Sequence, residues 1–152
     1  MAEEKIAAEG LLVGALLRIP YTIVTEAVEQ GLNMLGYKDV RAAHFSVLQP
    51  LAERPEGMRT TDLATWAQIT KPSIIYLVDH LEAHTYVERI ADPRDGRAQR
   101  VRLTAQGWNV VRAAREISRQ VEADWQARLG MEQLQQLKQI LRELIASFNA
   151  DK

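Results

Sequence analysis

The 152-residue sequence contains no cysteine, which excludes disulfide cross-links, thiolate metal sites and redox sensing by thiols. It also lacks a convincing export or membrane segment. The one run that resembles a signal sequence, residues 6–17, follows two glutamates, contains Glu9 and is too short to span a bilayer. We therefore predict a cytoplasmic protein with no membrane association.

Catalytic motifs are also missing: there is no glycine-rich phosphate loop, nucleophile elbow or paired acid–base motif. We predict that the protein is not an enzyme and that it uses no cofactor and no metal. His80 and His84 have the i, i+4 spacing that can place two imidazoles on one metal ion. Because no third ligand follows at a telling spacing, we interpret them as two exposed polar residues.

Positive and negative charges nearly balance, but they are unevenly distributed along the chain. The net charge of −1 by itself argues against a nucleic-acid partner. The first forty residues are acidic, whereas residues 89–102 contain five arginines against two aspartates. Arginine suits phosphates and narrow DNA grooves. Internal ion pairs with Asp92 and Asp95 are the alternative interpretation of these arginines.

The apolar residues, 47% of the chain, follow a helical pattern everywhere except around residues 86–103. Expected N-caps are Thr60 or Thr61, Thr70 and Thr104, and Gly36 is expected to close the first helix. The expected helices cover residues 10–35, 40–54, 61–67, 71–84 and 104–129, with a final helix after Gly130.

The non-helical segment has the pattern of a β-hairpin. Val101 and Leu103 alternate with Arg100 and Arg102, as in a half-buried strand. The hairpin turn is expected within residues 92–97, where Asp95-Gly96 is a strong turn signal. A tight connection at residues 68–70 joins the two preceding helices, so the order is helix, turn, helix, hairpin. This order predicts a winged helix-turn-helix whose second helix enters a major groove. Residues Ile74, Leu77, Val78 and Leu81 have the i, i+3, i+4, i+7 spacing of a buried helix face, so Ser73, Tyr76 and His80 are expected to face outward.

The two ends of the chain carry apolar residues that a single lobe cannot cover. We expect a twofold, self-complementary dimer built by these helices. The predicted interface residues are Leu12, Leu16, Leu134, Leu137, Leu141, Leu144 and Phe148. The fold class is mainly α with a small β-hairpin wing. One domain spans residues 1–152, with a DNA-binding lobe at 40–104 and a helical dimerisation region at 5–36 and 105–150.

Residues 77–107 resemble the MarR family, the multiple-antibiotic-resistance type of regulators. Three pieces carry the resemblance: Leu81-Glu82 leading to residues 86–89, then residues 92–97, then residues 103–107. It implies an obligate dimer, a recognition helix in the major groove and a wing in the minor groove. The DNA-binding residues it suggests are Thr70, Lys71, Pro72, Ser73, Tyr76, His80, Arg94, Asp95, Arg97 and Arg100. Thr85 and Gln68 stand where the family often has glycine, so we expect an altered end of the recognition helix.

Many members of that family bind a small, often aromatic ligand between the dimer helices and the DNA-binding lobe. The candidate ligand residues are Tyr21, His44, Phe45, Trp66 and Trp108, with ordinary core packing as an equal alternative. The sequence thus predicts a ligand-responsive, homodimeric repressor that recognises an inverted repeat in double-stranded DNA. A winged-helix protein-interaction module without a DNA target is the alternative function.

Overall fold

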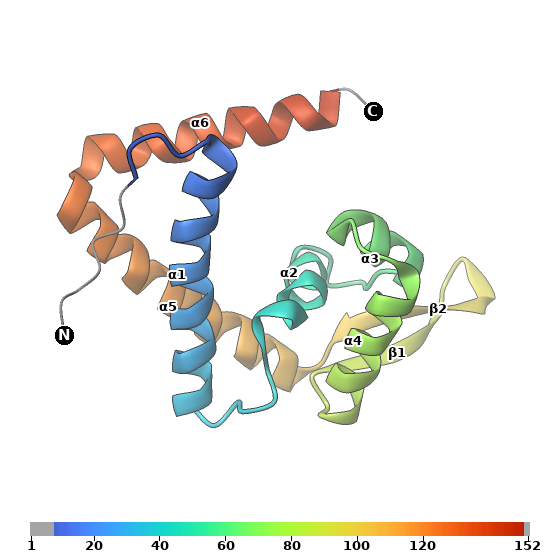
Figure 1. The fold of residues 1–152 in the computed structure, drawn as a ribbon. Coiled ribbons are helices and arrows are strands. Elements are labelled where there is room, and N and C mark those ends of the chain that lie inside the picture. Colours follow the sequence, from blue (N-terminus) through green and yellow to red (C-terminus); the bar gives the residue numbers. More distant parts are fainter. Residues whose placement is uncertain (1–7, 151–152) are drawn as a thin grey trace.

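The computed structural model describes residues 8–150, and for 149 and 150 only the backbone. Within this range the elements are α1 (Val13–Met34), η1 (Ala42–His44), α2 (Phe45–Glu53), α3 (Thr60–Ala67), α4 (Lys71–Ala83), β1 (Val87–Asp92), β2 (Asp95–Leu103), α5 (Ala105–Leu129) and α6 (Met131–Ala150). The winged lobe, defined as η1 through β2, lies to one side of α1, and α6 runs outside it (Figure 1). In the described residues no helix is long and apolar enough to cross a membrane.

Threonine caps begin two of the helices as predicted. Thr70 Oγ1 accepts a hydrogen bond from Ser73 N at 3.4 Å, and Thr104 Oγ1 accepts one from Gly107 N at 3.1 Å. The predicted cap of α3 is wrong, since Thr60 is already helical and Arg59 occupies the cap position without a side-chain bond. The extended Arg59 backbone offers its carbonyl to the first turn, so the helix begins one residue early.

The end of α4 keeps a left-handed turn although no glycine is present. Thr85 has a φ of 62°, and its N–H and that of Tyr86 close the helix on Glu82 O and Leu81 O at 2.9 Å each. The left-handed residue that the sequence reasoning expected to be strained is thus present at Thr85, and both closing hydrogen bonds are kept. Thr104 Oγ1 donates to Thr85 O at 2.5 Å, a contact from α5 that offsets the strain of the turn.

The hairpin turn is formed by Pro93 and Arg94, because Asp92 pairs with Asp95 across the strands. The turn therefore lies within the predicted range 92–97, but the Asp95-Gly96 signal inside that range is wrong, since both residues begin β2. Proline presets the backbone for the first turn position, and Asp92 Oδ1 accepts from Arg94 N at 2.9 Å. The predicted alternation in β2 is confirmed at its end, where buried side chains flank an exposed Arg102.

The core fills the junction of α1, the winged lobe and α5. Ile74, Val78 and Leu81 are fully buried, which confirms the predicted inner face of α4. Gly107 lets α5 begin against the hairpin, because a Cβ there would lie 2.0 Å from Tyr86 O. A Cβ at Gly31 would meet Ile117 Cδ1 at 2.6 Å, where α1 and α5 pack together.

Apolar side chains remain exposed on the two terminal helices. In the single chain Leu12 is 83% exposed and Phe148 is 61% exposed. Leu16, Leu137 and Leu144 are also exposed, and Leu141 is half-buried. Leu134 differs from the rest of the predicted interface, because the chain itself buries it.

Candidate nucleic-acid interface

The N-terminal part of α4 presents a polar face to solvent. Thr70 caps the helix, and Lys71, Pro72 and Ser73 form its exposed first turn. Tyr76 follows on the next turn and is 72% exposed. The helix N-terminus also brings free backbone N–H groups, which suit a phosphate. This face has the shape and chemistry of a recognition helix.

His80 lies one turn after Tyr76 on the same side of α4, but it is half-buried there because η1 packs against it, so its expected outward position is only partly met. Its ring is half-buried and stacks on His44 of η1, with ring centroids 4.5 Å apart and planes 8° apart. Its Nε2 lies 2.8 Å from Asp39 O. Helical periodicity does not reveal that η1 packs on this flank of α4, because that contact joins distant segments of the chain.

The tip of the hairpin carries two exposed arginines, Arg94 and Arg97. Asp95 is exposed beside them, and its Oδ1 accepts a hydrogen bond from Arg97 N at 3.1 Å. The carboxylate thus orders the backbone at the start of β2, while the Arg97 side chain extends from the tip. Arginine at this position of a winged helix can enter a narrow minor groove.

Asp92 is the buried anchor at the base of the wing. Its carboxylate accepts from Arg94 N and from Arg59 Nε, the latter at 2.6 Å, and it lies 3.2 Å from Arg100 Nε. The Arg94 N–H, followed by the Arg59 guanidinium, holds the pKa of this carboxyl well below its usual range. Arg59, which the sequence reasoning missed, therefore ties α3 to the hairpin.

Arg100 belongs to this buried network. Its side chain is 18% exposed and pairs with Asp92, so the internal ion pair considered from the sequence is present here. A DNA contact by Arg100 remains a prediction. The ion pair with Asp92 favours a role for this side chain in stabilising the base of the hairpin rather than in contacting DNA. Arg102 pairs with Glu88 at 2.7 Å on the exposed strand face.

A groove of about 530 Å³ separates α4 from the hairpin. Lys71 lines one side and Arg97 the other, so the two predicted DNA-binding elements share one concave surface. Arg89 of β1 also lines the groove, and it bonds Asp79 at 2.6 Å and Glu82 as well. These two ion pairs hold α4 against β1. Lining residues that the sequence reasoning missed are Thr60, Ile75, Arg89, Ala91, Gly96, Ala98, Gln99 and Val101.

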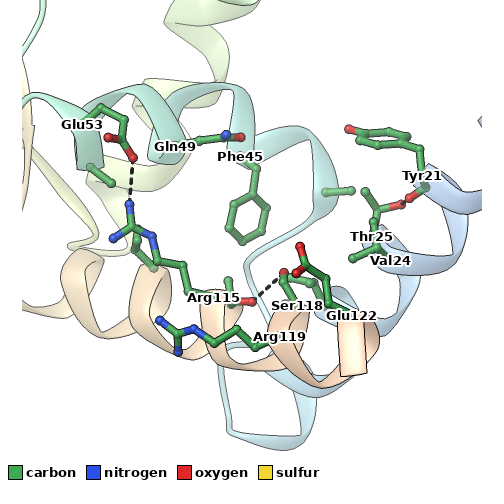
Figure 2. Close-up of a pocket in the computed structure, with 15 residues that line it drawn as sticks. Tyr21, Val24, Thr25, Phe45, Gln49, Glu53, Arg115, Ser118, Arg119 and Glu122 are labelled. Carbon is green, nitrogen blue, oxygen red and sulfur yellow. Dashed lines mark hydrogen bonds and ion pairs between the residues drawn. The ribbon is translucent and has the colours of Figure 1, made fainter. Parts of the chain in front are cut away.

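A separate cavity of about 480 Å³ lies between α1, α2 and α5. Figure 2 shows Phe45 projecting from α2 toward α5, with Tyr21 on the α1 side. The polar wall comes from α5, where Arg115 bonds Glu53 of α2 at 2.9 Å. The sequence reasoning missed this wall, which consists of Arg115, Ser118, Arg119 and Glu122.

A third cavity, of about 520 Å³, lies on the other side of Phe45. Tyr21 and Phe45 line both this cavity and the one beside α5, whereas Trp66 lines only the third. His44 and Trp108 line none of these three cavities. His44 is 5% exposed within its stack, and Trp108 packs against the core.

The arrangement of possible metal ligands bears on the expectation that the protein binds no metal. Within residues 8–150, no three histidine, aspartate or glutamate side chains converge closely enough to hold a metal ion. His80 and His84 stack at 4.5 Å between centroids instead of converging their nitrogens on one point. The expectation of no metal remains a prediction.

Comparison with known proteins points to one kind of molecule. A family model described as a winged helix DNA-binding domain matches residues 40–107. The transcriptional regulator HosA of Escherichia coli O111:H- is 28% identical over 107 residues, covering 70% of this chain and 78% of HosA. The transcriptional repressor Rv2887 of Mycobacterium tuberculosis is 28% identical over 137 residues, covering 90% of this chain and 96% of Rv2887.

Solved structures show the same fold. The crystal structure of Rv2887, a MarR family protein in complex with salicylic acid, superposes with a TM-score of 0.67. It is 28% identical, covering 91% of this chain and 99% of that one. A mutant of S. aureus MepR bound to an oligodeoxyribonucleotide gives a TM-score of 0.60 at 25% identity, with the same coverage of both chains.

Proposed function

We propose that the chain is a winged helix-turn-helix transcriptional regulator of the MarR family, and not an enzyme, and that it acts as a homodimeric repressor. It binds an inverted-repeat operator and releases it when a small aromatic acid occupies the cavity beside α5. A DNA-binding repressor acts where its operator is, so we place the protein in the cytoplasm.

The observation that carries the proposal is the groove between α4 and the hairpin. Lys71 on α4 and Arg97 on the hairpin line it from opposite sides. Lys71, Ser73 and Tyr76 would reach base edges and phosphates in the major groove, while Arg94 and Arg97 would extend to the adjacent minor groove. The S. aureus relative bound to an oligodeoxyribonucleotide supports this assignment.

The dimer follows from the exposed apolar side chains of the terminal helices. A second copy can cover Leu12, Leu16, Leu137, Leu144 and Phe148 through a self-complementary contact. Two copies related by a twofold axis place two α4 helices about one turn of DNA apart, roughly 34 Å, which matches an inverted repeat. We therefore propose that residues 5–36 and 105–150 form the dimerisation region.

The effector class follows from the cavity beside α5. Tyr21 and Phe45 offer aromatic surfaces (Figure 2). Arg115 and Arg119 bring guanidinium groups to the wall, where each already pairs with a carboxylate of the chain, Glu53 and Glu116, and a ligand carboxylate could share or replace these exposed pairs. A planar aromatic acid fits both features, and a relative crystallised with salicylic acid supports this class. His44 and Trp108 are not part of the proposed effector site, because they line neither cavity beside Phe45.

Selection from random DNA tests the proposal directly. The full-length protein is incubated with a library of random duplexes, and the retained fragments are sequenced. An inverted repeat bound by two protomers, and released by salicylic acid with a coupling of about 1–3 kcal/mol, is the expected result. Failure to enrich any duplex would contradict the proposal and favour a winged-helix module that binds another protein.

A further inference from the structure

Two aspartates at the hairpin tip hold the backbone beside the two arginines that are proposed to enter the minor groove. Asp92 Oδ1 accepts a hydrogen bond from Arg94 N at 2.9 Å, and Asp95 Oδ1 accepts one from Arg97 N at 3.1 Å. In both aspartates the second carboxylate oxygen is left for another partner. The direction in which each arginine leaves the hairpin therefore depends on where its aspartate is held.

The strand ladder does less to fix this part of the hairpin. In the described hairpin the register passes from the pair Asp92–Asp95 directly to the pair Ala91–Gln99, so the β2 residues around Arg97 form a bulge. A bulge interrupts regular pairing and changes the direction of the side chains that it carries. The hairpin also projects away from the helices of the lobe (Figure 1). The position of Arg97 thus depends on side-chain contacts more than on the ladder.

Arg59 is the partner that joins the two aspartates. Its Nε donates to Asp92 Oδ2 at 2.6 Å, and its Nη2 lies 3.9 Å from Asp95 Oδ2. The Asp92 side chain is fully buried, whereas the Asp95 side chain is about half exposed. A planar guanidinium can face two carboxylates at once in a fixed geometry. One side chain is therefore attached to the braces of both minor-groove arginines.

The backbone around Arg59 fixes where this guanidinium starts. Met58 N donates to Val101 O at 2.9 Å and Val101 N donates to Met58 O at 2.8 Å, so the segment before α3 pairs with β2. Arg59 follows directly at the cap position of α3, and its carbonyl accepts from Leu63 N at 3.0 Å. Because α3 packs on α4, the side chain extends from the junction between the recognition unit and the hairpin.

We propose that Arg59 is a positioning residue: by holding the two aspartates, it aligns the two arginines of the hairpin tip with α4. Its charge is neutralised by these carboxylates, so we assign it no phosphate of its own. Without this brace α4 would still enter the major groove, but the tip would no longer meet the adjacent minor groove at the correct place. The inference rests on the proposed function, because it requires an operator to be bound.

Substitution of the buried aspartate separates positioning from simple charge attraction. Asp92→Asn removes a negative charge near the DNA-binding surface, and the loss of that charge alone would strengthen attraction to phosphates. A neutral amide is, however, a weaker partner for the Arg59 guanidinium than a carboxylate. The proposal therefore expects Asp92→Asn to weaken operator binding at least about threefold, the opposite direction from the charge effect.

The main test uses the full-length protein and a fluorescent duplex obtained by selection from random DNA. Dissociation constants are measured by anisotropy at one ionic strength. Arg59→Gln should weaken binding at least about tenfold, equivalent to about 1.4 kcal/mol. In a chain that already carries Arg94→Ala and Arg97→Ala, Arg59→Gln should change affinity less than about twofold, because no minor-groove contact remains to be aligned. A loss that persists in that background would overturn the inference.

Arg102→Gln is the matched control. Arg102 lies on the same hairpin and pairs with Glu88 at 2.7 Å, so this variant loses the same charge and one exposed ion pair away from the tip. Its affinity should stay within about twofold of the natural value. A loss as large as that of Arg59→Gln would show that any missing arginine of this surface has the effect, and would overturn the inference.

Hydroxyl-radical footprinting locates the change on the DNA, because these radicals cut the backbone through the minor groove. At saturating protein, Arg59→Gln should lose protection only in the minor grooves reached by the hairpin tips and should keep the protection around α4. A general weakening of the fold would not produce this difference. Protection that is lost evenly over the whole operator would overturn the inference.

If Arg59→Gln does not fold, as judged by circular dichroism, Arg59→Lys replaces it. One ammonium group keeps the charge beside Asp92 but does not hold two carboxylates in the planar geometry. Its affinity should fall at least about threefold, and only while Arg94 and Arg97 are present. Natural affinity in a folded Arg59 variant, or natural or tighter binding by Asp92→Asn, would overturn the inference. Absence of any binding by the natural chain would instead show that the proposed function has failed.

Discussion

The winged lobe and the terminal helices use apolar side chains in opposite ways. In the lobe, Leu48, Leu63 and Ile74 are fully buried by neighbouring helices, so this part of the chain completes its own core. On the terminal helices, Leu12 and Phe148 are mostly exposed in the single chain. Solvent-facing apolar rows of this kind are unfavourable unless another surface covers them.

This difference separates two physical requirements. The lobe needs close packing, because the relative positions of α4 and the hairpin determine what DNA it fits. In the proposed dimer, a second copy would cover the terminal helices, and the twofold arrangement would place two lobes at the spacing of an operator. A substitution in the lobe should therefore affect folding or DNA contact. A substitution on the terminal helices should affect the association of two copies.

The largest effect is expected from Gly107→Ala, which attacks the packing of the lobe. The new Cβ would be 2.0 Å from Tyr86 O, and backbone atoms cannot rotate away. We expect the free energy of unfolding to fall by about 3 kcal/mol or more, measured by urea denaturation at fixed protein concentration. Gly14→Ala in α1 is the control: its Cβ meets open space, and a gain of about 0.5–1 kcal/mol is expected. Equal behaviour of the two variants would contradict the contrast between the regions.

The next effect concerns pH and again belongs to the lobe. His44 has a pKa lowered to about 4 in the folded chain, whereas in the unfolded chain it takes up a proton near pH 6.5. Its contribution to stability is therefore complete above about pH 6.5 and decreases as the pH falls toward about 4, by up to about 3 kcal/mol. Denaturation at several pH values should show this slope, and His44→Gln should flatten it. An identical slope in that variant would assign the effect to other groups.

Leu137→Glu combined with Leu141→Glu tests the terminal helices. Two carboxylates on the apolar face of α6 should prevent association while the lobe keeps its fold. Operator affinity is expected to fall at least roughly a hundredfold, about 2.8 kcal/mol. Light scattering and anisotropy give the two readouts, and Gln133→Glu with Gln135→Glu adds the same charge at exposed polar positions of α6. A double leucine variant that still binds an inverted repeat normally would show that assembly does not depend on this face.

Arg97→Ala removes a DNA contact without touching either core. The side chain is exposed beyond the Asp92 network, so folding should be unchanged. Operator affinity should fall about tenfold, roughly 1.4 kcal/mol, because a cation is lost from the minor groove. Arg112→Ala on α5 makes the same change in charge away from the hairpin and should have little effect. Natural affinity in folded Arg97→Ala would remove this arginine from the interface.

Tyr76→Ala is expected to have the smallest effect on affinity and to act on specificity. Its ring is 72% exposed on the outward face of α4, where it can reach base edges. Selection with the variant should return a different consensus, and Tyr76→Phe shows whether the hydroxyl is responsible. An unchanged consensus with Tyr76→Ala would make this residue a phosphate contact or a bystander.

Local patterns predicted most of the fold correctly. The caps at Thr70 and Thr104 and the inner face of α4 depend on neighbours within a few residues, and the structure confirms them. The hairpin turn lies inside the predicted range 92–97, but Asp95-Gly96, a strong local signal, indicated the wrong residues within it. The buried Asp92 carboxylate and Pro93 move the turn back by two residues, through contacts with Arg59 that the hairpin sequence alone does not show.

The candidate site was less predictable because it depends on packing between distant segments. His80 was assigned to the outward face from helical spacing, yet η1 covers that flank. Arg115 and Arg119 were missed as cavity residues, although polar residues spaced three and four apart along α5 were a visible signal. Which helix they face depends on how α2 packs on α5, and no pattern within α5 contains that information.

One aromatic ring divides two chambers of the molecule. Phe45 lines both the cavity beside α5 and the one beside Trp66, and Tyr21, Ala42 and Gln49 are shared walls as well. In the proposed effector site, the size of the molecule that fits would therefore depend on the Phe45 side chain, with no change of fold required. Replacing that ring with a smaller side chain would join the chambers, so descendants of one gene could diverge toward bulkier signals by a single codon change while the DNA-reading surface stays intact.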